Sequence, residues 1–343
     1  MTKVAVVILN WNTRELLERF LPGVIESAAA VPDEVSVVVA DNASTDGSVA
    51  FLQERFPSVG VIVLDRNYGF TGGYNRALEQ LEAEYFILMN SDIEVPRDWL
   101  VPLLGWMESH PDCGACGPKL LSITERDRFE YAGAAGGFLD RYGYPFCRGR
   151  VLSRTEKDRG QYDAPKDVLW VTGACLMVRS RLWRELGGLD SRFFAHMEEI
   201  DFCWRLQLCG WRVTVVPESR VWHLGGATLP QRSPWKLELN FRNNLLLLDT
   251  NLPDTIGATR SRLRIFLRQM LDGLSAIVYI CSGRPRYFAA VFRAHRAFRR
   301  LRKDKPVRPA ATPNARVAGL YRGWIIPEAL LKGDRVFEKV RTI

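Results

Sequence analysis

Three short groups of polar residues in this chain have the types and spacing of catalytic or ligand-binding side chains. The first, Asn90-Ser91-Asp92, directly follows the apolar run Phe86–Met89. A carboxylate just past a buried strand can bind a hard cation such as Mg²⁺ or Mn²⁺ and leave coordination positions for phosphate oxygens. Asp92 is the stronger candidate ligand, because Asn90 offers only a neutral carbonyl. Alone, the tripeptide is equally typical of a turn.

The second group places Glu198, Glu199 and Asp201 within four residues, after the aromatic pair Phe193-Phe194. Acidic residues are common in the first turn of a helix because the helix dipole stabilises their charge. Close carboxylates also repel one another, and apolar surroundings raise their pKa values, which suits a general base. The group therefore has a structural and a catalytic interpretation.

The third group is Trp222–Gly226, in which His223 follows a predicted strand and precedes two glycines. A single histidine is more often structural than a metal ligand. With acidic candidates elsewhere in the chain, however, His223 can complete the coordination of a cation.

The segments that would position these groups alternate between strand-like and helix-like patterns. Short apolar runs predict strands at 3–9, 35–40, 59–64 and 85–89, and helical spacing predicts helices between them at 13–30, 45–56 and 75–82. This alternation is typical of βαβ units in a mostly parallel sheet, in which ligands bind beyond the carboxyl ends of the strands. We therefore expect one shared site at the polar residues that follow the four strands, namely Asn10–Asn12, Asp41–Ser44, Arg66–Asn67 and Asn90–Asp92.

The pattern is weaker in the middle of the chain. A helix is predicted at 96–110, and residues 120–165 are rich in Gly, Tyr and Arg and are expected to be loops. Beyond them we predict a strand at 168–178 that holds Thr172-Gly173-Ala174, a helix at 198–209 and a strand at 212–216.

Taken in order, these motifs resemble glycosyltransferase family 2, the inverting enzymes of the GT-A fold, and especially its rhamnosyltransferase-like branch. The resemblance spans roughly residues 3–250. It rests on 6–12 (VVILNWN), 41–48 (DNASTDGS), 67–75 (NYGFTGGYN), 90–92 (NSD), 172–174 (TGA), 198–201 (EEID), and Trp222-His223 with Gly225-Gly226.

The resemblance implies a role for each motif. It implies a Mg²⁺ or Mn²⁺ ion held by Asp92 and His223, and a catalytic base among Glu198, Glu199 and Asp201, with Glu199 expected. The family's usual Glu-Asp pair is Glu-Glu here, and its Asp-x-Asp is Asn-Ser-Asp, which removes one charge from the cation site. The implied substrate-binding residues are Leu9, Asn10, Asp41, Asn67, Gly72, Gly73, Asn75, Asn90 and Gly173.

The implied activity is transfer of a sugar from a nucleotide-sugar to a hydroxyl of a glycan or lipid-linked saccharide, in cell-surface polysaccharide synthesis. The rhamnosyltransferase-like branch favours dTDP-rhamnose as donor; a UDP-hexose or UDP-N-acetylhexosamine is the alternative. A processive polysaccharide synthase would need membrane spans, and no apolar run approaches the roughly 20 residues that a span requires. A nucleotidyltransferase or a non-catalytic membrane-associated protein would leave the acidic group and His223 unexplained.

The charge is unevenly distributed along the chain. Residues 257–343 hold 20 Lys/Arg and 5 Asp/Glu, whereas residues 1–256 hold 27 and 34. We therefore expect a GT-A catalytic domain at 1–256 and a basic helical region at 257–343, with two amphipathic helices within 261–303. Such helices suit an anionic membrane surface; packing on the catalytic domain is the alternative, and nucleic-acid binding is not expected. The odd number of cysteines, seven, and the lack of a signal-like start favour a cytoplasmic protein, with peripheral attachment to the inner face of the plasma membrane as one option.

Overall fold

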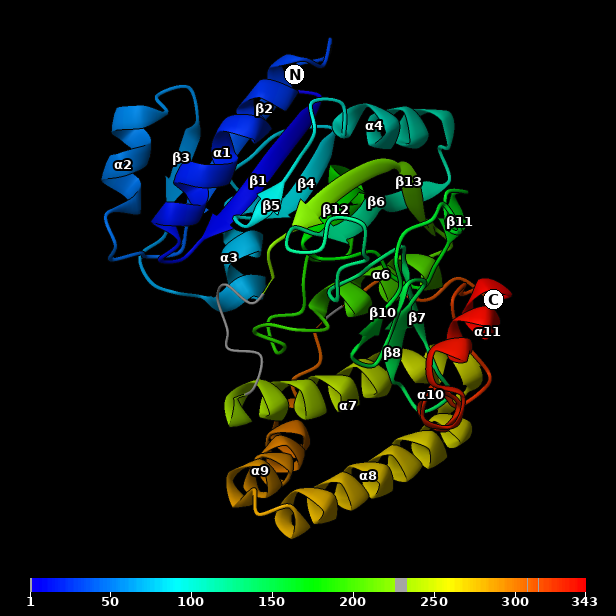
Figure 1. Ribbon diagram of the computed structural model, residues 1–343. Helices are drawn as coiled ribbons and strands as arrows, with labels where there is room; N and C mark the ends of the chain where they lie inside the picture. The colour runs from blue at the N-terminus through cyan, green and yellow to red at the C-terminus, as the bar shows by residue number, and fades with distance from the viewer. Residues whose placement is uncertain (1, 226–232, 307, 314) are drawn as a thin grey trace.

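The chain forms an α/β fold around a central sheet, as a computed structural model that describes residues 2–225, 233–306, 308–313 and 315–343 shows (Figure 1). Gly226 of the histidine motif lies outside these residues. Four parallel strands make up one half of the sheet, in the order β3-β2-β1-β4. Their short runs of Val, Ile and Leu are typical of strands covered on both faces. The four strands are β1 (Val4–Asn10), β2 (Val35–Asp41), β3 (Gly60–Val63) and β4 (Tyr85–Asn90).

The other half of the sheet is mixed. β12 (Cys175–Arg179) lies antiparallel between β4 and β6 (Cys113–Ser122), and β13 (Arg212–His223) runs parallel to β6. The two-residue strands β5 (Ile93–Glu94) and β11 (Lys166–Asp167) both pair with β13. The strand predicted at 168–178 is therefore shorter, the one at 212–216 is longer, and β6 was not predicted, because its glycines and proline weaken the strand pattern.

Helices cover both faces of the sheet. Val4, Val6 and Ile8 of β1 pack with α1, α2 and α4, whereas the alternate residues Ala5 and Val7 belong to the core shared with α3, α5, α6 and α7. The predicted α/β class is thereby confirmed. The first six helices are α1 (Arg14–Ala29), α2 (Ser48–Arg55), α3 (Gly69–Leu78), α4 (Leu100–Ser109), α5 (Ser180–Glu185) and α6 (Glu198–Leu208).

Residues 120–165, expected to be loops, contain a small antiparallel sheet in the order β10-β9-β8-β7. The end of the chain packs against it: the backbones of Leu139 and Tyr321 are hydrogen-bonded, and Arg341 pairs with Glu156. The elements concerned are β7 (Gly137–Leu139), β8 (Pro145–Cys147), β9 (Arg150–Val151), β10 (Arg154–Thr155), α10 (Ile325–Lys332), the 3₁₀ turn Gly333–Arg335 and α11 (Val336–Arg341).

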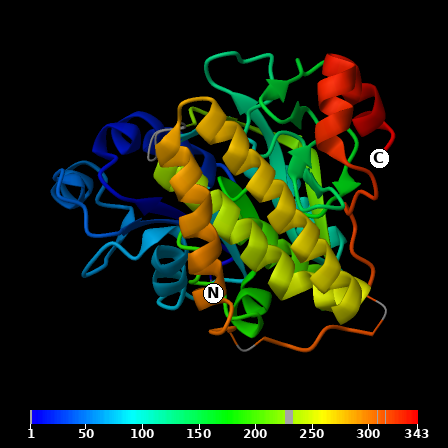
Figure 2. The ribbon, with the colours of Figure 1, turned by 90° about the horizontal axis from the view of Figure 1, so that it is seen from below.

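Three long helices form a layer beneath the sheet domain (Figures 1 and 2). They are α7 (Pro234–Ile256), α8 (Ala258–Cys281) and α9 (Pro285–Leu301), and α8 and α9 both pack on α7. The two helices expected within 261–303 are confirmed, with their turn at 282–284. The predicted boundary after residue 256 falls at the break between α7 and α8. That residues 257–343 form a separate domain stays a prediction.

Candidate active site

The ends of three neighbouring strands are joined by a network of buried side chains. Asn10, the last residue of β1, donates to Asp41 Oδ2 at the end of β2 (2.7 Å) and accepts from Thr13 Oγ1 (2.6 Å). Thr13 in turn lies 3.0 Å from the hydroxyl of Ser91, just past β4. The backbone N–H of Ser44 donates to the remaining Asp41 oxygen (2.8 Å). The predicted convergence of these strand ends is confirmed, but Asn10 and Asp41 are buried and bonded to protein groups.

The glycine-rich segment is bound to the end of β2 by Asn42, one of the polar residues expected at this strand end. The Asn42 side chain accepts from the backbone of Tyr68 (2.9 Å) and donates to Asn67 (3.1 Å) and to the carbonyl of Gly69 (3.0 Å). Asn67 accepts from the N–H of Gly69 (2.8 Å), and α3 begins there rather than at the predicted residue 75.

Gly73 lets α3 approach the first strand closely. A Cβ atom at this position would lie 2.7 Å from Leu9 Cδ1 and 3.2 Å from Asn42 Nδ2. Leu9 and Gly73 therefore contact each other, and the role of this glycine is close helix–strand packing.

Asn75 lies on the same helix but binds a different part of the protein. Its amide donates to the carbonyl of Leu189 (2.8 Å) and accepts from the N–H of Leu189 (2.9 Å). Both ends of the amide are thus used to hold the chain after α5. In the structure Asn75 holds this segment in place, and its predicted part in substrate binding stays a prediction.

Asp92 and His223 lie side by side, although 130 residues separate them. The pairing of β5 with β13 places Ile93 opposite His223, so that Nε2 of His223 is 3.1 Å from Asp92 Oδ1. Asp92 Oδ2 accepts from the N–H of Gly225 (3.2 Å), and Nδ1 of His223 lies 3.3 Å from Glu130 Oε2. All three side chains are largely buried.

These groups fit a divalent cation. A carboxylate oxygen and an imidazole nitrogen facing each other suit Mg²⁺ or Mn²⁺, and a carboxylate on the far side of a histidine ring commonly orients a metal-binding histidine. Burial lowers the pKa of His223, but Asp92 and Glu130 outweigh it and raise that pKa to about 10. A cation bound at Nε2 would therefore displace the proton of the ring. Nothing in the sequence pattern pointed to Glu130. Within the part of the chain that the structure describes, no three His, Cys, Asp or Glu side chains form a metal shell.

The three acidic candidates at the start of α6 have different surroundings. Asp201 is fully buried, accepts from Arg205 Nε (2.7 Å) and from Asn251 (2.8 Å), and so holds α6 in place. Glu198 is buried, and its Oε2 finds no hydrogen-bond partner among the described residues. Glu199 is half-buried. The structure therefore separates Asp201 from the predicted catalytic group.

Burial raises the pKa of both glutamates. For Glu198, burial and the nearby charge of Glu199 raise the pKa well above its usual value. For Glu199, burial raises the pKa to about 7, against the lowering effect of backbone N–H groups at the helix start and of Arg150. Glu199 therefore changes protonation near neutral pH.

The loop before α6 is strained and bound from below by α7. Phe194, His196 and Met197 all have φ between 65° and 73°, a region that L-residues adopt at a cost. The buried amide of Asn243 donates to the carbonyls of Phe193 (3.0 Å), Ala195 (2.8 Å) and His196 (2.7 Å). The sequence analysis missed Asn243, because an asparagine inside a helix carries no local sign of its partner.

The same loop contacts the glycine-rich segment. The carbonyl of Phe194 accepts from the N–H groups of Phe70 (2.8 Å) and Thr71 (3.2 Å). Gly69 lies so close that a Cβ there would be 2.5 Å from the Phe194 ring. The glycine-rich segment and the loop that leads to α6 are thus in direct contact.

The turn Thr172–Ala174 joins the remaining predicted residues. The carbonyl of Ala174 accepts from the backbone N–H of Asn90 (3.0 Å), and Gly173 lies against the side chain of Glu199. The structure thereby connects Asn90, two residues before Asp92, with Glu199.

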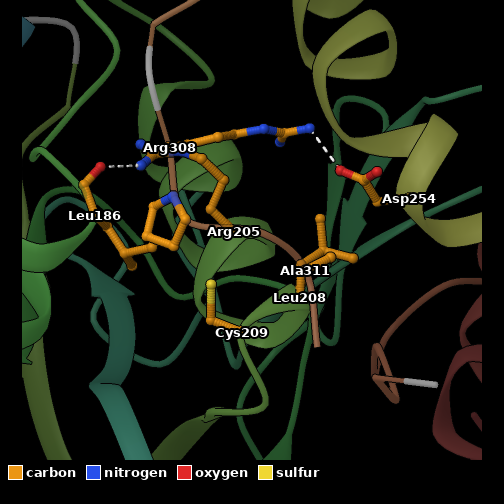
Figure 3. Close-up of a pocket in the computed structure, with 8 residues that line it drawn as sticks. Leu186, Arg205, Leu208, Cys209, Asp254, Arg308 and Ala311 are labelled. Carbon is orange, nitrogen blue, oxygen red and sulfur yellow. Dashed lines mark hydrogen bonds and ion pairs between the residues drawn. The ribbon is translucent and has the colours of Figure 1, made fainter. Parts of the chain in front are cut away.

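The crevice in Figure 3 is separate from this site. It lies at the opposite end of α6, and an ion pair between Arg308 and Asp254 (2.6 Å) closes one side of it. Its lining residues are Leu186, Arg205, Leu208, Cys209, Asp254, Arg308, Pro309 and Ala311.

The sheet order and the polar strand ends are those of the GT-A fold. Two solved structures share this fold. One is GalNAc-T7 with UDP, GalNAc and Mn²⁺, with a TM-score of 0.56 and 17% identity; the match covers 73% of this chain and 48% of that one. The other is the mannosyltransferase PcManGT from Pyrobaculum calidifontis with GDP-Man and Mn²⁺, with a TM-score of 0.53 and 16% identity; the match covers 99% of this chain and 83% of that one. The chain thus spans about half the length of the GalNAc-T7 chain.

The chain belongs to glycosyl transferase family 2: residues 5–187, more than half of it, match the model of that family. It is 29% identical over 236 residues to N-acetylglucosaminyl-diphospho-decaprenol L-rhamnosyltransferase of Mycobacterium tuberculosis. This aligned region covers 64% of this chain and 75% of that relative. It is also 25% identical over 243 residues to the O-antigen biosynthesis protein RfbC of Myxococcus xanthus. This aligned region covers 68% of this chain and 18% of that relative. The predicted family and its rhamnosyltransferase-like character are confirmed.

Proposed function

We propose that this chain is an inverting, cation-dependent glycosyltransferase that transfers rhamnose from dTDP-rhamnose to a hydroxyl of a lipid-linked saccharide, in cell-surface polysaccharide synthesis. The similarity to a rhamnosyltransferase named for a diphospho-decaprenol acceptor supports this donor and this acceptor class. A UDP-hexose or UDP-N-acetylhexosamine donor is the alternative.

One observation carries the catalytic part of the proposal. The turn Thr172–Ala174 contacts both the strand end that precedes Asp92 and the side chain of Glu199. This contact supports placing a cation ligand and a candidate base in one site, as a displacement reaction at a nucleotide-sugar requires.

Glu199 is the base in this proposal. Its pKa of about 7 leaves a substantial fraction of the carboxylate deprotonated at neutral pH, and it is strong enough to take a proton from an attacking hydroxyl. Burial and the nearby charge of Glu199 raise the pKa of Glu198 well above its usual value, which disfavours its charged form. Asp201 is bound to Arg205 and keeps a structural role.

Asp92 and His223 would hold the cation, through Oδ1 and Nε2. A bound Mg²⁺ or Mn²⁺ supplies positive charge that stabilises the departing nucleoside diphosphate. The glycine-rich segment, which Asn42 and Asn67 hold in place, would line the donor beside it.

The reaction is a single in-line displacement. The acceptor oxygen forms a bond to the anomeric carbon from the face opposite the diphosphate, and the bond from that carbon to the diphosphate oxygen breaks. The hydroxyl proton passes to Glu199. General-base assistance of this kind contributes roughly 10²–10⁴ in rate.

A donor panel tests the proposal. The full chain is incubated with Mn²⁺ or Mg²⁺, a lipid-linked N-acetylglucosamine acceptor, and dTDP-rhamnose, UDP-glucose, UDP-N-acetylglucosamine or GDP-mannose, and nucleoside diphosphate release is measured. We expect dTDP-rhamnose to be preferred by about tenfold or more. Preference for a UDP-sugar would replace the donor assignment. Release no faster than that of Glu199→Gln with every donor would contradict the enzymatic proposal itself.

A further inference from the structure

Helix α8 has its apolar side chains on the outside. Its inner face, at helical spacing, consists of Ser261, Ile265, Arg268, Asp272 and Ala276, all buried. Its outer face carries a stripe of large apolar side chains that are 38–62% exposed. The stripe, called the α8 stripe below, is Leu263, Phe266, Leu267, Met270, Leu274, Ile277 and Val278.

A buried polar cluster fixes this orientation. Arg268 Nε donates to Asp272 Oδ1 (2.7 Å), and Asp272 Oδ2 lies 3.1 Å from Nε2 of His295 on α9. The Arg268 guanidinium also lies over the ring of Tyr144, 4.0 Å from its centre, and donates to the carbonyl of Tyr142 (3.2 Å). Turning α8 over to bury its stripe would break these contacts between α8, α9 and the loop that contains Tyr142 and Tyr144.

The surroundings of the α8 stripe are strongly basic. Residues 257–303 contain eleven arginines, one lysine and a single acidic residue, the buried Asp272. On α9, the aromatic Phe292 is 58% exposed, and Arg286, Arg296, Arg299 and Arg300 are exposed with it. An apolar stripe beside arginines, with no exposed acid in the same segment, complements an anionic surface that has an apolar interior.

The arrangement of the helices leaves this face open. α8 and α9 run side by side along the underside of the molecule, on the far side of α7 from the sheet (Figures 1 and 2). None of the helices in the described residues is both long and apolar enough to cross a bilayer. An outward stripe about 22 Å long, over sixteen residues of α8, is a larger apolar patch than a protein surrounded by water usually exposes.

We infer that the α8–α9 hairpin lies flat on an anionic lipid bilayer, with the α8 stripe and Phe292 entering the headgroup–acyl boundary and the arginines contacting lipid phosphates. α7 separates the hairpin from the loop before α6, which Asn243 of α7 binds directly. One helix layer, roughly 10 Å, thus separates the hairpin from the loop that leads to Glu199. This attachment needs no particular donor, and it would present a lipid-linked acceptor to the site if the proposed function holds.

Vesicle binding of the full chain tests the inference. Co-sedimentation is measured with phosphatidylglycerol/phosphatidylcholine vesicles and with phosphatidylcholine alone, at low and at high salt. We expect binding to the anionic vesicles that weakens with salt. The variant Phe266→Ser/Met270→Ser/Ile277→Ser should reduce binding about tenfold or more, because it removes apolar groups that enter the bilayer. Arg296→Glu/Arg299→Glu should reduce binding to anionic vesicles by a similar factor.

Val63→Ser/Leu330→Ser/Leu331→Ser is the matched control, because it removes three apolar side chains that lie outside the hairpin and are at least as exposed, and it should bind like wild type. Circular dichroism and donor hydrolysis in detergent-free solution check that each variant is folded, and they report the proposed function independently of membranes. A dye on Cys281, which is exposed at the end of α8, should shift its emission to the blue on anionic vesicles. Half-buried Cys209 is replaced by Ser for this labelling.

Three results would overturn the inference: no binding of wild type to anionic vesicles, equal binding by the α8 variant, or an unshifted dye on bound protein. A dimer that forms in solution and is lost in the α8 variant, without vesicle binding, would also overturn it and would show that the stripe is a protein interface.

Discussion

Gly173 lies directly against Glu199: a Cβ atom at Gly173 would be 3.3 Å from Cβ and 3.5 Å from Cγ of the glutamate. The absence of a side chain at Gly173 therefore sets where the proposed base stands. This contact joins two motifs that are 26 residues apart and lie on different elements.

Gly173→Ala should lower turnover with little effect on folding. The added methyl group would displace Glu199 by a few tenths of an ångström, and misplaced catalytic groups cost up to about 10²-fold in rate. We expect roughly a tenfold loss in kcat, with the free energy of unfolding changed by about 1 kcal/mol or less. Gly105→Ala is the control, because a Cβ there has no neighbour within 4 Å. Equal turnover of wild type and Gly173→Ala would show that this contact does not position the base.

Glu199→Gln should reduce kcat by about 10²–10⁴ and leave the KM for the donor nearly unchanged, because the amide cannot take a proton. In wild type, kcat should rise with pH up to about 7, since the base is the deprotonated carboxylate. Glu198→Gln should keep this pH profile. If Glu198→Gln loses the profile and Glu199→Gln keeps it, the two roles are exchanged.

The same raised pKa makes folding stability fall as pH rises, whereas kcat is expected to rise with pH. In the folded protein Glu199 keeps its proton up to about pH 7, whereas a glutamate in the unfolded chain releases its proton near pH 4.5. Between these values the native state binds more protons, so this residue lowers the free energy of unfolding as pH rises. Glu199→Gln should therefore be more stabilising at pH 8 than at pH 5 in urea denaturation. A stability difference between variant and wild type that is independent of pH would contradict the raised pKa.

Asp201→Asn should destabilise the protein without changing the chemistry. Breaking the buried pair with Arg205 leaves a charge without its partner, at about 3–5 kcal/mol. At a temperature at which the variant remains folded, kcat and its pH profile should match wild type. Loss of activity in the folded variant would show that Asp201 takes part in catalysis.

Cation binding should depend on Asp92 and, less strongly, on Glu130. Mn²⁺ affinity in the presence of dTDP is measured by titration of the Mn²⁺ electron-spin signal, which does not require turnover. Asp92→Ala should abolish binding, and Glu130→Gln should weaken it about 10–100-fold, because Glu130 orients His223. Glu94→Gln is the control, since Glu94 lies nearby but pairs with Arg126 at the surface. Unchanged affinity in Asp92→Ala would exclude this site for the cation.

Asn243→Ala should damage both stability and catalysis. Removing the amide leaves the carbonyls of Phe193, Ala195 and His196 without this donor, at about 1–3 kcal/mol. The strained loop would then move relative to α6, and kcat should fall more than in an equally destabilised control. Leu246→Ala supplies that control, because it removes a fully buried side chain of α7 that makes no hydrogen bond to the loop. Equal effects of both variants on kcat would give Asn243 a purely structural role.

Local sequence was sufficient to predict the parallel strands, the meeting of their ends and the family. Runs such as Val4–Asn10 and Tyr85–Asn90 have only one favourable environment, the interior of a sheet, and strand–helix alternation then places their ends on one edge. The positions of Asn10, Asp41 and Ser91 in a single cluster followed from that rule. The ordered motifs were specific enough to identify the family.

Tertiary structure alone decided which polar groups are free to act. Asn75 and Asp201 have the residue types of ligands, yet both bind distant protein groups, Leu189 and Arg205. Glu130 and Asn243 have no local sign of function and acquire one through His223 and the loop before α6. The apolar stripe of α8 was visible in the sequence, but its outward direction depends on where Arg268, Asp272 and His295 meet. The pattern along a chain shows which face of an element is apolar, whereas the element packed against it determines whether that face is buried.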